Sequence, residues 1–212
     1  MSADAPISSL ELSALISSKI CHDVIGPVGA IFNGLEVLED DDDPESREYA
    51  LKIIKDFTQQ ASAKVEFARF AFGAAGSAGA VIDLGNAHKI SQAYIGEDKH
   101  KLDWQVPPGH MPKDKVKLLL NMLACAITAL PRGGTLQVMA QNIETTPSFM
   151  IRCSGDAARQ PKHLADFISG AGADSLDALT IQAYYTSLLA TEAGMKIAIS
   201  DDNGDVLLTA MG

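Results

Sequence analysis

Apolar residues recur every three or four positions over residues 8–39, which predicts one long amphipathic helix. An acidic run, EDDDDP, follows and predicts a solvated turn, with Asp43 as N-cap and Pro44 in the first helical position. A second helical stripe continues to Phe72, so two helices of about 30 residues, each about 45 Å long, should run antiparallel. The two stripes are Leu12, Ile16, Ile20, Val24, Val28, Ile31, Leu35 and Leu38, then Leu51, Ile54, Ala61, Val65, Ala68 and Phe72.

Such a hairpin buries too little apolar surface to be stable alone. A second hairpin would complete a four-helix bundle, but the chain contains no other pair of long helices. We therefore expect a homodimer that forms through residues 8–73.

The pattern changes after GAAGSAG at residues 73–79, a small-residue linker that separates a hairpin of residues 1–75 from a second domain of residues 80–212. Alternating patterns predict strands over AVID and KLDWQV and two strand pairs, GTLQVMAQNI with SFMIRCS and MKIAIS with DVLLTA, the second joined through Asn-Gly. Helical patterns cover 84–95, 112–130, 160–170 and 175–193. This order predicts an α+β domain in which helices cover one face of a single mixed sheet.

Composition narrows the class of function. The 212 residues are 47% apolar and carry a net charge of −10, which argues against nucleic-acid binding and suits a protein that meets other proteins. The three cysteines form no Cys-x-x-Cys pair, so neither a zinc site nor a disulfide framework is expected. The N-terminal residues show no signal peptide, and the apolar run LLLNMLACAITAL is too short to cross a bilayer. A reduced, cytoplasmic environment fits these features.

His22 lies on the outward face of the first predicted helix, because it is two positions from both Ile20 and Val24 of the core stripe. Two glycines and a proline follow it, although an interior glycine costs a helix about 1 kcal/mol and a proline about 3 kcal/mol. Pro27 also leaves the carbonyl of residue 23 without its helical partner and should bend the helix there. The same outward face collects Ser18, Lys19, Ile25, Gly26 and Gly29.

The stretch CHDVIGP resembles the H-box of two-component histidine kinases, where a histidine, an acid and a proline at the fifth following position occupy the first helix of a dimerising hairpin. The stretch LLLNMLACAITALPRGGTL resembles the N-box region of the kinase ATP-binding domain, and the resemblance extends from about residue 10 to residue 212. Three nucleotide-binding elements depart from the kinase pattern. Cys125 replaces the magnesium-binding asparagine, IRCSGDAARQP lacks the Asp-x-Gly-x-Gly motif, and SLDALTIQAYY lacks a glycine run.

With these departures the chain is identified as a member of the ChpT-type histidine phosphotransferases, which join a dimeric hairpin to a degenerate kinase-like (Bergerat-type) domain. The resemblance implies that His22 is the phospho-acceptor of a cell-cycle phosphorelay. It further implies partners among response-regulator receiver domains: the receiver of the hybrid kinase CckA as donor, and CtrA and CpdR as acceptors. The chain itself would bind no ATP, metal or other cofactor, and the receiver would supply Mg²⁺.

Asp23 and Lys19 each allow two interpretations. Asp23 either assists His22, by holding the ring or moving a proton, or is simply solvated, and Lys19 either contacts the phosphoryl group or is a surface lysine. Receivers are expected to dock on Ser18, Ile25, Gly26 and Gly29, with Lys64 and Phe67 at the edge. His88, His100, His110 and His163 have no metal-ligand spacing. Two alternatives stay open: an ATP-dependent histidine kinase with atypical boxes and a non-catalytic dimeric adaptor that binds receivers.

Overall fold

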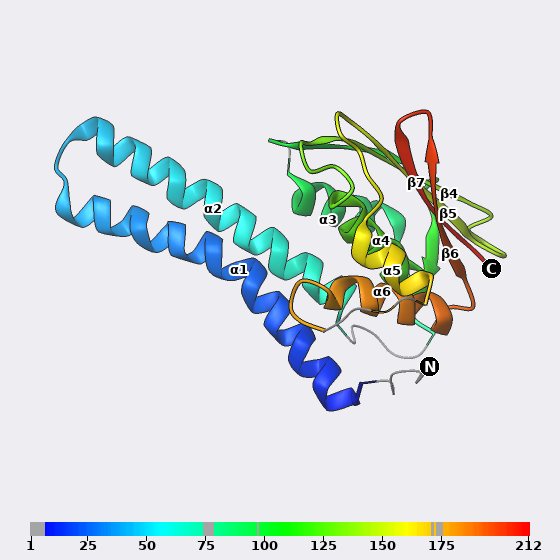
Figure 1. Ribbon diagram of the computed structural model, residues 1–212. Coiled ribbons are helices and arrows are strands. Elements are labelled where there is room, and N and C mark those ends of the chain that lie inside the picture. The colour runs from blue at the N-terminus through cyan, green and yellow to red at the C-terminus, as the bar shows by residue number, and fades with distance from the viewer. Residues whose placement is uncertain (1–6, 74–78, 97, 171, 173–175) are drawn as a thin grey trace.

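The computed structural model describes residues 7–73, 79–96, 98–170, 172 and 176–212. Its first part is an antiparallel hairpin of α1 (Ser9–Asp40) and α2 (Pro44–Ala71), which projects as a long arm from the rest of the chain (Figure 1). The side chain of Ser8 accepts a hydrogen bond from the N–H of Glu11 at the start of α1, and Asp43 accepts one from the N–H of Ser46 at the start of α2. The predicted hairpin, its turn and the N-cap at Asp43 are therefore confirmed. Most of the predicted linker, residues 74–78, lies outside the described part.

The second part is an α+β domain with a five-stranded mixed sheet of order β2-β4-β5-β7-β6. Strand β2 is parallel to β4, and the other neighbours are antiparallel. The helices α3 to α6 cover one face of this sheet (Figure 1). The elements are β1 (Val81–Asp83), α3 (Leu84–Ile95), β2 (His100–Gln105), β3 (His110–Pro112), α4 (Lys113–Ile127), β4 (Gly134–Gln141), β5 (Ser148–Ser154), α5 (Lys162–Ile168), α6 (Ile181–Glu192), β6 (Lys196–Asp202) and β7 (Asp205–Met211).

Two details of this domain differ from the sequence prediction. Strands β1 and β3 form a separate two-stranded sheet, so the prediction of a single sheet is wrong; the three residues of β3 are too few to show an alternating pattern. The helix predicted over 175–193 begins only at Ile181. The Asp177 carboxylate there accepts hydrogen bonds from the N–H groups of Leu179 and Thr180 and holds them in a turn instead.

The core of the second domain is centred on α4, in which ten of 15 residues are buried. Asn121 of α4 ties this core to the hairpin, because its amide donates to the carbonyl of Ala71 at the end of α2 (2.9 Å). The ring of Phe67 also stacks on Tyr94 of α3, with ring centroids 3.7 Å apart. The second domain is thus anchored at the C-terminal end of α2, and α6 additionally contacts α1.

The hairpin itself is held together along a line of small residues. Pro27 and Gly34 are the buried residues of α1, and a Cβ atom at Gly34 would lie 2.8 Å from Cγ1 of Ile54 in α2. The predicted core stripe is therefore only partly right within one chain, because Val28 and Leu35 remain 49% and 46% exposed. Close approach of two helices requires small residues at the contact, so the larger apolar side chains lie beside it.

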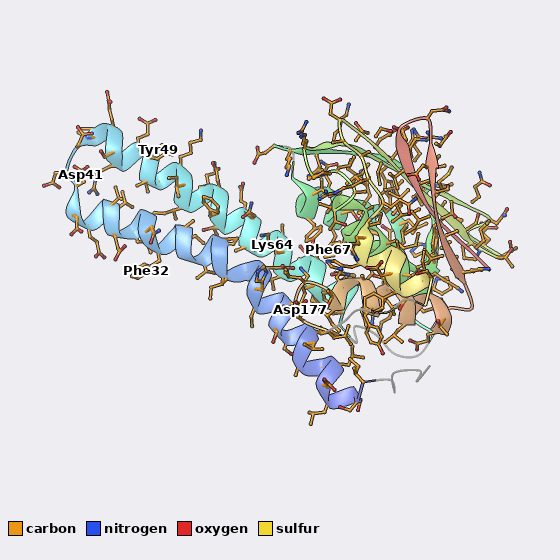
Figure 2. All side chains as sticks on the ribbon, in the orientation of Figure 1. Phe32, Asp41, Tyr49, Lys64, Phe67 and Asp177 are labelled. Atoms are coloured by element: carbon orange, nitrogen blue, oxygen red, sulfur yellow. The ribbon has the colours of Figure 1, made fainter. Side chains whose placement is uncertain are left out.

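Four of the exposed apolar side chains of the hairpin form two pairs, one on each helix. Val28 and Leu35 are two helical turns apart on α1, and Leu51 and Val65 share one face of α2. Val28 and Val65 line the same groove between the helices. We call these four residues the outer stripe. Phe32 is likewise exposed and points away from α2 (Figure 2).

Candidate functional site

His22 is exposed on α1, with 60% of its side chain accessible. Its Nδ1 atom lies 3.5 Å from Oδ1 of Asp23, and among the described residues Asp23 is its only hydrogen-bonding partner. A carboxylate beside Nδ1 favours the tautomer in which Nδ1 carries the proton. In that tautomer the other ring nitrogen, Nε2, keeps its lone pair and can act as the nucleophile.

Asp23 is not a freely solvated residue. Its carboxylate binds the ammonium group of Lys19 at 2.5 and 2.6 Å, and its side chain is 25% exposed. Of the two readings that the sequence left open, this geometry favours a carboxylate that holds the ring of His22. The ammonium group of Lys19 forms an ion pair with the Asp23 carboxylate. The Lys19 side chain is only 14% exposed and lines a cavity of the second domain. This placement argues against the surface-lysine reading and gives the ammonium a partner other than a phosphoryl group.

The carbonyl of Asp23 has its own partner. Pro27 has no N–H, so this carbonyl lacks the usual helical hydrogen bond. Nζ of Lys64, on α2, donates to it instead over 3.0 Å. The sequence predicted the free carbonyl but placed Lys64 at the docking edge, because the pattern of α2 does not show which α1 atom lies opposite. Figure 1 shows that α1 changes direction partway along its length, and Figure 2 places Lys64 where α2 nears the second domain.

Four of the predicted docking residues share the exposed side of α1 with His22: Ser18, Ile25, Gly26 and Gly29. We call these five residues the His22 face. A Cβ atom at Gly26 or Gly29 would meet no atom within 4 Å, whereas the same addition at Gly34 would meet α2. Packing therefore gives no reason for glycine at residue 29, whereas Gly26 precedes Pro27, whose ring disfavours a Cβ atom on the helical residue before it. Each glycine costs the helix about 1 kcal/mol.

Phe67 was expected at the edge of the docking face, and this expectation is wrong for the structure described. Phe67 is 2% exposed and stacks on Tyr94. The second domain covers this side of α2, which the sequence of the hairpin alone cannot show.

The region of the second domain that resembles the kinase N-box is filled by internal contacts. The buried thiol of Cys125 lies 3.4 Å from Oγ1 of Thr186, and burial raises the pKa of this thiol to about 11, so it remains neutral. Neutral thiols are poor ligands for Mg²⁺. The amide of Asn121 donates to the carbonyls of Ala71 and Lys117 and accepts from Gln182. The polar groups of Cys125 and Asn121 therefore form hydrogen bonds within the fold.

The cavity beside Cys125 is small. It measures about 170 Å³ and is lined by Lys19 of α1 together with α4, α5 and α6 residues such as His163 and Gln182. Pockets for small molecules and cofactors are typically about 300 Å³ or larger. In the part of the chain that the structure describes, no group of three or more His, Cys, Asp or Glu side chains could hold a metal ion.

Three other histidines have partners that fit structural roles. His88 stacks on Trp104 with ring centroids 5.3 Å apart, and Trp104 packs against the core. Nε2 of His100 lies 3.1 Å from the carbonyl of Leu130. His110 is exposed and lies 4.0 Å from the Asp83 carboxylate.

Comparison with known proteins gives results that agree with each other. A family model described as the histidine phosphotransferase C-terminal domain matches residues 84–205. The chain is 46% identical over 211 residues to the protein phosphotransferase ChpT of Brucella abortus (strain 2308), in an alignment that covers 99% of this chain and 100% of that protein. A solved structure described as a bacterial phosphotransferase at 1.7 Å is 43% identical and superposes with a TM-score of 0.90, over 99% of this chain and 100% of the other.

Proposed function

Since the chain belongs to the histidine phosphotransferase family and is a phosphotransferase, we propose that His22 carries the phosphoryl group between aspartates of response-regulator receiver domains. The observation that carries this proposal is the exposed imidazole with Nδ1 toward Asp23 and Nε2 free. No other histidine with a described partner combines exposure on the hairpin with a carboxylate held in place by a lysine.

The proposed reaction begins when the lone pair of Nε2 attacks the phosphorus of an aspartyl phosphate in line. The N–P bond forms as the bond from phosphorus to the aspartate oxygen breaks, and the aspartate leaves as a carboxylate. The ring, with Nδ1 still protonated, gains positive charge, which the Asp23 carboxylate stabilises. Transfer to a second receiver reverses these bond changes. Transition states of this kind are loose, so positioning and charge neutralisation supply most of the catalysis.

The His22 face is the proposed docking surface for receivers. The open space above Gly26 and Gly29 lets another backbone approach closely, and Ile25, 71% exposed, offers an apolar contact. Toward the turn, an apolar groove of about 230 Å³ continues between the two helices. We propose that a docked receiver extends onto this groove, which Ala30, Asn33, Gly34 and Val37 of α1 and Tyr49, Ala50, Ile53 and Phe57 of α2 line.

The outer stripe is the proposed dimer interface. By length and composition alone α1 could cross a membrane, but Lys19, His22 and Asp23 lie within it, and charged groups are costly in a bilayer interior. A second hairpin would cover the stripe and complete a four-helix bundle. Such a dimer would leave the His22 face of each protomer accessible to receivers in the cytoplasm, the location that we propose.

The donor is proposed to be a phosphorylated receiver, which brings its own Mg²⁺, and not ATP. The neutral thiol of Cys125, the internal hydrogen bonds of Asn121 and the 170 Å³ cavity support this choice. The resemblance of the sequence to ChpT-type proteins extends the proposal to particular receivers, with CckA as donor, CtrA and CpdR as acceptors, and a role in the cell cycle.

The test is incubation of the protein with a phosphorylated receiver, followed by detection of acid-labile, base-stable phosphate on the chain. We expect His22→Ala to remove this phosphate entirely while the protein still binds the receiver, because the side chain is 60% exposed and its loss should leave the fold intact. His110→Ala, which changes an exposed histidine of the second domain, serves as the matched control and should retain transfer.

Three results would contradict the proposal. Phosphorylation of His22 by Mg-ATP without any receiver would identify a kinase. Receiver binding without phosphate on the wild-type chain would identify an adaptor. Phosphate that persists in the His22→Ala protein would move the acceptor to another residue.

A further inference from the structure

Pro27 creates a defect in α1 one turn after the candidate acceptor. In a regular helix the N–H of residue 27 would bond to the carbonyl of residue 23, and proline has no N–H to give. An unpaired carbonyl in a partly buried position costs free energy comparable to a lost hydrogen bond. The defect therefore needs a donor from elsewhere in the fold.

Lys64 supplies that donor from the other helix of the hairpin. Its Nζ lies 3.0 Å from the carbonyl oxygen of Asp23, and the bond is partly buried. A bond from an ammonium to a carbonyl is charge-assisted and stronger than one between neutral groups. Lys64 also lines the cleft between α2 and α3.

Asp23 is consequently held at two points. Lys64 binds its main-chain carbonyl, and Lys19 binds its carboxylate. Among the residues the structure describes, Asp23 is in turn the only hydrogen-bonding partner of the His22 ring. The orientation of the imidazole therefore depends on a turn of helix whose backbone is completed by a side chain from α2.

We propose that Lys64 is a positioning residue: its ammonium takes the place of the missing N–H of residue 27 and fixes the turn that carries Asp23 and His22. The inference rests on the proposed function, because it treats His22 as the phospho-acceptor. It also explains how the helix retains a proline near its reacting residue without losing the geometry of that residue. Lys64 acts through Asp23 and contacts neither the phosphoryl group nor the receiver.

The test is a double-mutant cycle between residues 64 and 27. Lys64→Met keeps the length and apolar character of the side chain but removes the donor, and Lys64→Arg retains a donor as the conservative control. We expect Lys64→Met to slow phosphorylation of His22 by a phosphorylated receiver about tenfold at saturating receiver, with the receiver Kd unchanged and activity largely restored in Lys64→Arg. A lysine that contacted the receiver would instead change the Kd.

The Pro27→Ala background makes the test specific. Alanine at this position has the N–H that proline lacks and can bond to the Asp23 carbonyl itself. In that background Lys64→Met should slow the reaction less than about twofold, since the substitute donor is no longer needed. Thermal unfolding measured on the same four proteins should show the same coupling between the two positions.

Each outcome decides the matter. Equal slowing by Lys64→Met in both backgrounds would overturn the positioning role while leaving His22 as the acceptor. If Lys64→Met fails to fold with Pro27 but folds in the Pro27→Ala background, the coupling is confirmed, and failure to fold in both backgrounds would overturn it. Absence of phosphohistidine in the wild-type protein would instead contradict the proposed function. The wild-type reaction is measured alongside the variants, so the two failures can be distinguished.

Discussion

The hairpin and the second domain differ in how many of their residues are buried within the chain. In α4 ten of 15 residues are buried, whereas α1 buries two of 32 and α2 three of 28. The second domain closes its core with its own sheet and helices, and among its described side chains only the hydroxyl of Ser91 is buried without a hydrogen-bonding partner. The hairpin leaves large apolar side chains in solvent along most of its length.

The difference shows which surfaces the chain completes by itself. Apolar surface removed from water contributes about 25 cal/mol per Å², and the hairpin gains little of this within one chain. Under the proposed function, a second copy would cover the outer stripe and a receiver would cover the His22 face. The second domain supplies rigidity, because Asn121 and the Phe67–Tyr94 stack fix one end of the hairpin.

The largest expected effect is loss of the dimer when a charge enters the outer stripe. Leu35 is 46% exposed in one chain, so Leu35→Glu places a carboxylate in water in the monomer but in an apolar interface in the dimer. We expect the variant to sediment as a folded monomer at concentrations where the wild-type protein is dimeric. Lys52→Glu, which changes an exposed polar position of α2, is the control and should leave the dimer intact. A dimeric Leu35→Glu protein would place the interface elsewhere.

A second prediction concerns how the effect of a substitution on unfolding free energy depends on protein concentration in each region. Leu119 is completely buried in α4, so Leu119→Ala should cost about 2–5 kcal/mol of unfolding free energy at any concentration. Leu35→Ala should cost little in the monomer, and its effect should appear only where the dimer forms. Chemical denaturation at two widely separated protein concentrations measures both. A concentration-independent loss for Leu35→Ala would mean that its side chain stabilises the single chain.

The fold was largely predictable because its signals are local. The two helices of the hairpin, Asp43 with Pro44, and the Asn-Gly turn before β7 each depend on neighbouring residues, and each is confirmed. The predictions that were wrong depend on contacts between distant segments. The separate sheet of β1 and β3 and the late start of α6 both belong to this class.

The candidate site shows the same division. The outward position of His22, the adjacent acid and the carbonyl freed by Pro27 follow from spacing along one helix. The roles of Lys64 and Phe67 could not be predicted, because they depend on which atoms of α1 and α3 lie opposite α2. The environment of the glycines of α1 could not be predicted either, since sequence alone does not distinguish a glycine that faces α2 from one that faces solvent.

The smallest expected effect distinguishes those two kinds of glycine. At Gly34 a Cβ atom would lie 2.8 Å from Cγ1 of Ile54 and 3.4 Å from the carbonyl oxygen of Ala50, so Gly34→Ala forces the Ile54 side chain or the two helices to shift. We expect a net loss of about 1–2 kcal/mol after the gain in helix propensity. At Gly29 the space is open and no proline follows, so Gly29→Ala should raise stability by about 0.5–1 kcal/mol. Thermal or urea unfolding should therefore give opposite signs for two Gly→Ala changes on one helix.

Phosphoryl-transfer assays on variants of residue 26 test why the chain retains glycine there. If the open space serves a docked receiver, Gly26→Leu should fold and dimerise normally yet slow phosphoryl transfer about tenfold or more, because the added side chain keeps the receiver backbone from close approach. Gly26→Ala, with one added carbon, should slow transfer less. Transfer at the wild-type rate in Gly26→Leu would show that receivers dock on another surface, and the steric restriction before Pro27 would then be the remaining explanation of the glycine.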